Sequence, residues 1–315
     1  MWLLFLPLLI PALAGAAARP LAARLEPRQA TWLLTLAAVA LAACSTAALA
    51  LLAAYAAARL PALAAVGNYS QPVIRRGDPI PVAAGVAAAL ALTAATTAFA
   101  VMVRNRARAL GESYRRAAGL QPDGGIVVLP GGSIEAYALP GLPGRIVVSG
   151  CLLDRLDSRG RDALVAHEQA HLSGRHHLFV AVAMVAAAAN PLLLPVRRAV
   201  EYTVERWADE RAAAVTGDRR LVAQTIGQVA LLARPRPGRR TAGVVLGIAG
   251  TRARRMSVAW AGPVPRRVAA LLAAPPRRRT VLLVACAAIV VLTGGAALEA
   301  ARDLHALVEL AQAGR

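Results

Sequence analysis

Lysine is absent from this sequence, so all 36 basic residues are arginine. Cysteine is nearly absent too: Cys44, Cys151 and Cys286 are widely separated, and two of them lie inside apolar runs. This spacing excludes a disulfide framework and a CxxC metal site. The uniform use of arginine is typical of a GC-rich genome and does not by itself indicate a specialised binding surface.

Negative charge is also scarce, since only 17 acidic residues offset the arginines and the formal net charge is +19. A basic balance of this size is one sign of a nucleic-acid-binding protein. Here the arginines flank apolar stretches and no nucleic-acid recognition motif accompanies them. Arginines in that position are typical of a membrane surface. We therefore expect a lipid bilayer as partner and no direct binding of nucleic acid.

Long apolar runs are abundant: 57% of the residues are hydrophobic and the mean hydropathy is +0.53, although only 4% are aromatic. Such a composition is too apolar for an ordinary soluble domain and indicates membrane spans. Four runs are long enough to cross a bilayer, at residues 1–18, 30–58, 82–103 and 280–300. A secretory signal peptide is the alternative for the first run, but the absence of a basic segment before it favours a retained span.

The arginine distribution predicts the orientation of these spans. Residues 19–29 and the basic segment from Arg104 onward are expected on the cytoplasmic side. The connector at 59–81 is then outside, despite its three arginines. We predict three regions: an N-terminal membrane region with three spans (1–103), a cytoplasmic domain (104–279), and a C-terminal span with a short tail (280–315).

The cytoplasmic region carries an HExxH motif, formed by His167, Glu168 and His171, and residues 162–165 lead into it without Gly or Pro. The motif is predicted to lie on a helix with its N-cap at Ser158. Residues four apart share a helix face, so both imidazoles can hold one Zn²⁺ ion, with Glu168 as general base for a water molecule. The alternative is a plain helix with two satisfied histidines. It is weakened because four of the chain's five histidines lie within residues 167–177.

A third ligand must lie on the same side of the membrane as these histidines. Glu201, Glu205 and Asp209 are spaced by four on a charged helical run, so they can present one carboxylate to the metal and another to orient a histidine. The apolar segment 178–196 between the two helices must then enter and return, or lie buried. Its Asn190-Pro191 break suits such a bend.

Short strands are predicted at Ile126–Leu129, at residues 133–139 and at Arg145–Ser149. Zinc peptidases commonly bind substrate by adding its backbone to an exposed strand edge. Glu135, Ala136 and Tyr137 are the candidate edge for a substrate strand, and an ordinary structural hairpin is the alternative.

The ordered set HEQAH (167–171), Asn190-Pro191 and Glu205-Arg-Trp-Ala-Asp209 resembles the integral-membrane zinc metallopeptidases of family M56, the β-lactam sensor-transducer peptidases. It is similar, more distantly, to family M48. The resemblance implies a mainly α-helical multi-pass plasma-membrane protein with a cytoplasmic zincin-like (α+β) domain. It implies one Zn²⁺ per chain held by His167, His171 and Glu205, with Glu168 as catalytic base and Asp209 as an outer carboxylate.

The resemblance also implies cleavage of a protein substrate, for which a winged-helix repressor is one candidate. The chain stops at Arg315, so we expect no extracellular sensor domain and no direct β-lactam sensing. A catalytically silent receptor or scaffold, an M48-like quality-control protease and, less readily, a metal transporter are the alternatives. Candidates for stabilising the oxyanion are Tyr137, Tyr202, His176 and Arg267. His176 and His177 are otherwise interpreted as polar residues at a membrane-facing helix end.

Overall fold

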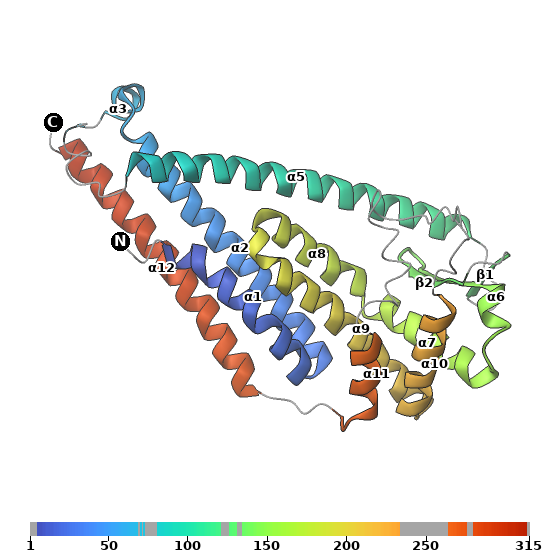
Figure 1. Cartoon of the computed structure of the whole chain (residues 1–315). Coiled ribbons are helices and arrows are strands. Elements are labelled where there is room, and N and C mark those ends of the chain that lie inside the picture. Colours follow the sequence, from blue (N-terminus) through green and yellow to red (C-terminus); the bar gives the residue numbers. More distant parts are fainter. Residues whose placement is uncertain are drawn as a thin grey trace.

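A computed structural model describes residues 5–68, 70, 72, 81–120, 126–130, 134–233, 264–275 and 280–313. The protein is an elongated, mostly helical molecule (Figure 1), with long apolar helices at one end and a small sheet with shorter helices at the other. Part of the predicted outer connector, residues 73–80, lies outside the described residues.

Three helices among the described residues are long and apolar enough to cross a membrane: α1 (Leu6–Arg24), α2 (Pro27–Ala57) and α5 (Val82–Gly119). They cover the first three predicted spans, and a short helix, α3 (Pro61–Gly67), follows α2. The predicted last span falls within α12 (Thr280–Ala313), which packs along α2 and α1.

Helix α5 does not end at Val103, where the apolar run ends, but continues without a break to Gly119. The Arg/Ala-rich residues that follow Val103 are good helix formers and contain no proline. The far end of α5 is tied to the sheet because the Ser113 hydroxyl donates a hydrogen bond of 3.0 Å to the Pro140 carbonyl. One helix therefore joins the apolar end of the molecule to the sheet (Figure 1).

The described sheet has three strands in the order β1 (Ile126–Leu129), β3 (Arg145–Ser149) and β2 (Ala136–Leu139). Strand β1 is parallel to β3, and β2 is antiparallel to it with Tyr137 opposite Val147. Strands β1 and β3 begin and end where the sequence predicts, whereas the strand predicted at residues 133–139 begins only at Ala136. One face of the sheet packs on α7 (Ser158–Ser173). A short helix, α6 (Gly150–Leu153), precedes α7 in the chain.

After α7 the chain makes a helical hairpin of α8 (His176–Ala189), a 3-10 turn η2 (Pro191–Leu193) and α9 (Leu194–Thr216). The Asn190 side chain stabilises the turn, since its carbonyl accepts from Leu192 N–H and its amide donates to the Ser45 hydroxyl of α2 at 2.9 Å. A second buried hydrogen bond, from the Thr31 hydroxyl to the Thr203 hydroxyl, joins α2 to α9. The hairpin returns α9 to the side of α7.

Two further helices complete this end of the molecule: α10 (Arg219–Leu232) and α11 (Val264–Leu272). The Asp218 carboxylate caps α10 by accepting from Arg220 N–H and Leu221 N–H. Helix α11 packs against α10 and α9 and buries Arg267 and Leu271. Its position brings one arginine of α11 into the space between α7 and α9.

Candidate metal centre

Helix α7 carries the HExxH motif and begins at Ser158, but its N-cap is Asp157 and not Ser158 as the sequence analysis predicts. The Asp157 carboxylate accepts a hydrogen bond of 2.7 Å from Gly160 N–H. A carboxylate at this position satisfies an otherwise unpaired amide and complements the helix dipole. The cap fixes the start of the helix, and His167 and His171 then share the face that turns toward α9.

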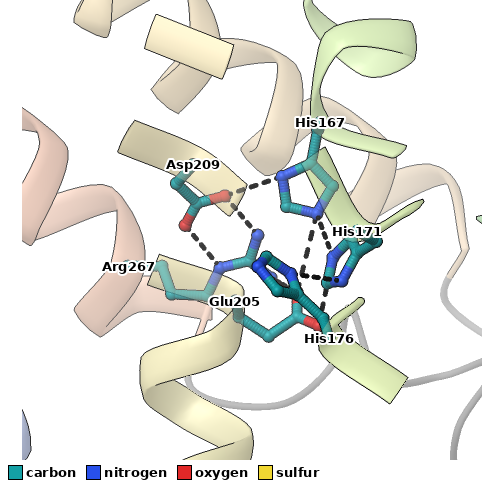
Figure 2. Close-up of polar contacts among 6 residues, drawn as sticks. All are labelled: His167, His171, His176, Glu205, Asp209 and Arg267. Atoms are coloured by element: carbon teal, nitrogen blue, oxygen red, sulfur yellow. Dashed lines mark hydrogen bonds and ion pairs between the residues drawn. The ribbon is translucent and has the colours of Figure 1, made fainter. Parts of the chain in front are cut away.

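The ligand atoms of His167, His171 and Glu205 converge between α7 and α9 (Figure 2), all within 4.8 Å of one another. The two Nε2 atoms are 3.1 Å apart. His171 Nε2 lies 3.6 Å from Glu205 Oε1, and His167 Nε2 lies 3.7 Å from Glu205 Oε2. Glu201, the other carboxylate considered from the sequence, instead accepts a hydrogen bond from Arg197 Nε.

These separations can be compared with those of a zinc site. Two ligand atoms at about 2.0–2.1 Å from a tetrahedral Zn²⁺ ion stand about 3.3 Å apart. The measured 3.1, 3.6 and 3.7 Å lie around that value, and a two-histidine, one-carboxylate set is a ligand combination that catalytic zinc sites use. The residues present therefore fit a zinc ion that keeps one position for water or substrate.

Behind His167 lies a buried pair formed by Asp209 and Arg267 (Figure 2). Asp209 Oδ1 is 3.1 Å from His167 Nδ1, the nitrogen that faces away from the other ligands. Arg267 donates to both Asp209 oxygens, at 2.8 and 2.5 Å, and its Nη1 lies 2.8 Å from Glu205 Oε2. One guanidinium thus holds the outer carboxylate and the third candidate ligand in a fixed relation.

The surroundings push the pKa values of these groups apart. Burial would raise the pKa of Glu205 and of Asp209, but the Arg267 charge outweighs it and keeps both pKa values below their usual range. Burial lowers the pKa of His171 to about 4, so its imidazole is neutral at pH 7. Burial would also lower the pKa of His167, but hydrogen bonds with Asp209 and Glu205 raise it to about 9. A metal ion binding at neutral pH therefore displaces a proton from His167.

Glu168 is buried beside the three candidate ligands, with 3% of its surface exposed. Burial raises the pKa of its carboxyl group to about 7, although the charge on His167 and a hydrogen bond from Ala138 N–H oppose the shift. A carboxyl group with a pKa near the working pH is suited to accept a proton and to return it. The hydrogen bond also links this carboxylate to strand β2.

Strand β2 is at one edge of the described sheet, next to α7. Ser149 N–H donates to the Glu135 carbonyl, so the Glu135 and Tyr137 backbones face β3, and those of Ala136 and Ala138 face outward. Of the predicted edge residues, Ala136 is therefore the one whose backbone faces away from β3. The Tyr137 side chain lies with Val127 and Val147 on the sheet face opposite α7.

Two of the four candidates for stabilising an oxyanion, Arg267 and Tyr137, are not placed for that role. Arg267 is occupied by the two carboxylates, and Tyr137 lies on the far face of the sheet. The ring of Tyr202 lies under the Arg266 guanidinium, 4.4 Å from the ring centroid. His176, which the sequence analysis interpreted chiefly as a polar residue at a helix end, lies at the start of α8. It is 1% exposed, and its Nδ1 is 3.1 Å from Nδ1 of His171 (Figure 2).

Replacing Arg267 with methionine is expected to destabilise the metal-free protein by about 3–5 kcal/mol at pH 7, because it removes the guanidinium that pairs with the buried Asp209 carboxylate and the partly exposed Glu205 carboxylate. Both carboxyl groups have lowered pKa values, so this stabilisation is present above about pH 4.5 and is lost as the pH falls. Thermal unfolding at pH 7 measures the effect. Arg266→Met, the same change one residue earlier, is the control, and equal melting temperatures for the two variants would contradict the expectation.

The site combines three features: an HExxH motif on a helix, a carboxylate from a second helix and an adjoining edge strand. Metallopeptidases use centres of this kind. The comparison with protein families agrees with that class. Residues 102–184 match the model of peptidase family M48, a family of zinc metallopeptidases. No curated protein and no solved structure shows significant similarity to the chain.

The matched residues run from the second half of α5 through the sheet and α7 into α8. They include the HExxH histidines and His176, and they end before Glu205 and Asp209. The match is to M48, the more distant of the two resemblances found in the sequence, and it gives no specific support to M56.

Proposed function

We propose that the protein is a membrane-embedded, zinc-dependent endopeptidase that cleaves a protein substrate on the cytoplasmic side of the membrane. The observation that carries the proposal is the convergence of His167, His171 and Glu205 around one point, with the Glu168 carboxylate buried beside them. The match of residues 102–184 to a zinc metallopeptidase family supports the metallopeptidase part of this proposal.

The proposed roles of the residues follow from their chemistry. His167, His171 and Glu205 hold the metal, and Asp209 fixes the ring of His167. When bound, zinc would lower the pKa of a water molecule and polarise the substrate carbonyl. Glu168 accepts the proton of the attacking water and delivers it to the leaving amine. The outward-facing backbone groups of β2 pair with the substrate in an extended conformation.

Two substrate classes remain in the proposal. A winged-helix repressor is the substrate that the M56 likeness implies, and it rests on the Asn190-Pro191 break and the Glu205 motif. Misfolded membrane proteins are the substrate that an M48-like quality-control protease would take, and this class rests on the likeness to M48.

Removal of metal tests the proposal directly. The detergent-purified protein should cleave an unstructured reporter polypeptide, lose that activity with 1,10-phenanthroline and regain it when a stoichiometric amount of Zn²⁺ is added, because the metal supplies the electrophile. Mass spectrometry of the products locates the cleaved bonds. Cleavage that the chelator leaves unchanged would contradict a metallopeptidase. Bound zinc without any cleavage would favour the silent scaffold.

The orientation can be tested with topology reporters fused after residues 29, 70, 120 and 215. We expect the fusions at 29, 120 and 215 inside and the fusion at 70 outside, because the arginines at 19–29 and from Arg104 onward are retained in the cytoplasm. Accessibility of each reporter in intact cells is the measurement. If 120 and 215 report opposite sides, α7 and α9 cannot share a metal ion in the membrane.

A further inference from the structure

The two histidines of the metal centre are each backed by a buried group on the side away from the other ligands. His167 has Asp209 behind it, with 3.1 Å between Nδ1 and Oδ1. His171 has His176 behind it, with 3.1 Å between the two Nδ1 atoms. Asp209 was expected from the sequence, whereas His176 was interpreted there as a polar residue at a helix end. His176 has no role in the mechanism proposed above.

The backbone between α7 and α8 is built so that His176 returns to the site. Arg175 adopts a left-handed conformation (φ 49°, ψ 41°), which folds α8 back by 58° relative to α7. Gly174 leaves room for the ring, since a Cβ there would lie 2.3 Å from His176 Nε2. The Trp207 indole covers the imidazole, with ring centroids 4.6 Å apart. A turn, a glycine and an aromatic side chain from α9 therefore fix one buried imidazole.

Only one arrangement of protons between His171 and His176 is compatible with a metal ion. A neutral imidazole carries one N–H, and a metal needs the lone pair of His171 Nε2, the atom that faces His167 and Glu205. The proton of His171 then sits on Nδ1 and is donated to Nδ1 of His176. The reverse arrangement would place a proton on His171 Nε2 and block metal binding.

This arrangement places the proton of His176 on Nε2, a buried atom without a hydrogen-bond partner among the described residues. Leaving a buried donor unpaired costs about 1–3 kcal/mol. The packing of Trp207 and Gly174 around the ring holds His176 in place despite this cost.

We propose that His176 is a positioning residue for the metal centre, accepting a hydrogen bond from His171 Nδ1 and so fixing the tautomer and ring orientation of that ligand. The inference rests on the proposed function, because it takes His171 as a zinc ligand. Outer partners of histidine ligands are usually carboxylates, backbone carbonyls or water. A second, neutral histidine orients the ring without adding charge to a site that already holds three carboxylates, those of Glu168, Glu205 and Asp209.

Two substitutions separate this role from simple packing. His176→Leu keeps the bulk of the side chain under Trp207 but removes the acceptor. His176→Asn removes bulk but places its Oδ1 where the Nδ1 atom lies, so the acceptor remains. His177→Leu, the same change at a partly exposed neighbour, is the control. The full chain is purified in detergent, stripped of metal and titrated with Zn²⁺ against a competing chelator, and the thermal stability of each metal-free variant is recorded.

We expect His176→Leu to weaken zinc binding about 10–100-fold. His176→Asn should bind within a few-fold of the unaltered protein even if it is the less stable variant, and His177→Leu should bind normally. Zinc binding by His176→Leu within twofold of the unaltered protein would overturn the inference, as would equal weakening in the Leu and Asn variants. Tight zinc binding by the unaltered protein without any peptide cleavage would contradict the proposed function but not the role of His176. No zinc binding by the unaltered protein would contradict both.

Discussion

Replacing Glu168 with glutamine is expected to lower kcat/KM for peptide cleavage by about 10²–10⁴-fold, the range that a positioned general base contributes. Glutamine has the same shape and can still accept the hydrogen bond that Ala138 N–H donates, but it cannot take a proton from water. The three candidate ligands are unchanged, so the zinc content should stay equal to that of the unaltered protein. Cleavage assays and metal analysis on the same preparation measure both quantities.

The pH profile gives a second measure of the same residue. Glu168 must be ionised to act as a base, so kcat/KM should fall tenfold per pH unit below its pKa. That pKa is about 7 in the metal-free protein because the carboxyl group is buried, and a bound divalent cation lowers it. The acid limb of the loaded enzyme should therefore lie below pH 7.

Glu201→Gln is the matched control for Glu168→Gln, since Glu201 is a partly exposed glutamate that pairs with Arg197 away from the site. It should cleave at the normal rate. A Glu168→Gln variant that retained full activity would remove the case for an enzyme and favour the scaffold.

Replacing Glu205 with alanine is expected to weaken zinc binding by more than the roughly 10–100-fold that loss of an outer partner costs, because it removes a ligand outright. This expectation rests on the distances of 3.6 and 3.7 Å from the Glu205 oxygens to Nε2 of His171 and His167. Zinc stoichiometry of the purified, dialysed protein is the measurement. Arg267 keeps Asp209 as a partner in this variant, so the fold should survive.

Glu201→Ala is again the control, one helical turn earlier on the same helix. Its zinc content should be normal. Loss of zinc in Glu201→Ala with retention in Glu205→Ala would place the third ligand one turn away from the point where the two histidines meet.

Those parts of the site that depend on local spacing could be predicted from the sequence. Two histidines four apart must share a face of α7, and Glu205 and Asp209 must share a face of α9. The apolar runs similarly predicted α1, α2 and the first part of α5, because length and hydropathy are sufficient for that inference.

Features that depend on tertiary contacts could not be predicted. His176 follows His171 by five residues, which is not a helical spacing, and only the Gly174-Arg175 turn brings the two rings together. The bond between Arg267 and Asp209 joins residues 58 apart in the chain. The cap of α7 was misplaced by one residue because Asp157 and Ser158 are both good N-caps, and only the carboxylate's reach to Gly160 N–H decides between them.

Helix α5 sets more than the distance between the apolar end of the molecule and the sheet. A residue added to an α-helix turns everything beyond it by about 100° and advances it by about 1.5 Å. Because α5 runs unbroken for 38 residues, its rotational phase sets the direction in which the Ser113 hydroxyl points, and this hydroxyl must meet the carbonyl of Pro140, the residue after β2. One inserted residue after Val103 would turn Ser113 away from Pro140 by about a quarter turn, whereas seven would restore its direction to within about 20°. The contact between α5 and the end of β2 therefore constrains the angular register of the helix.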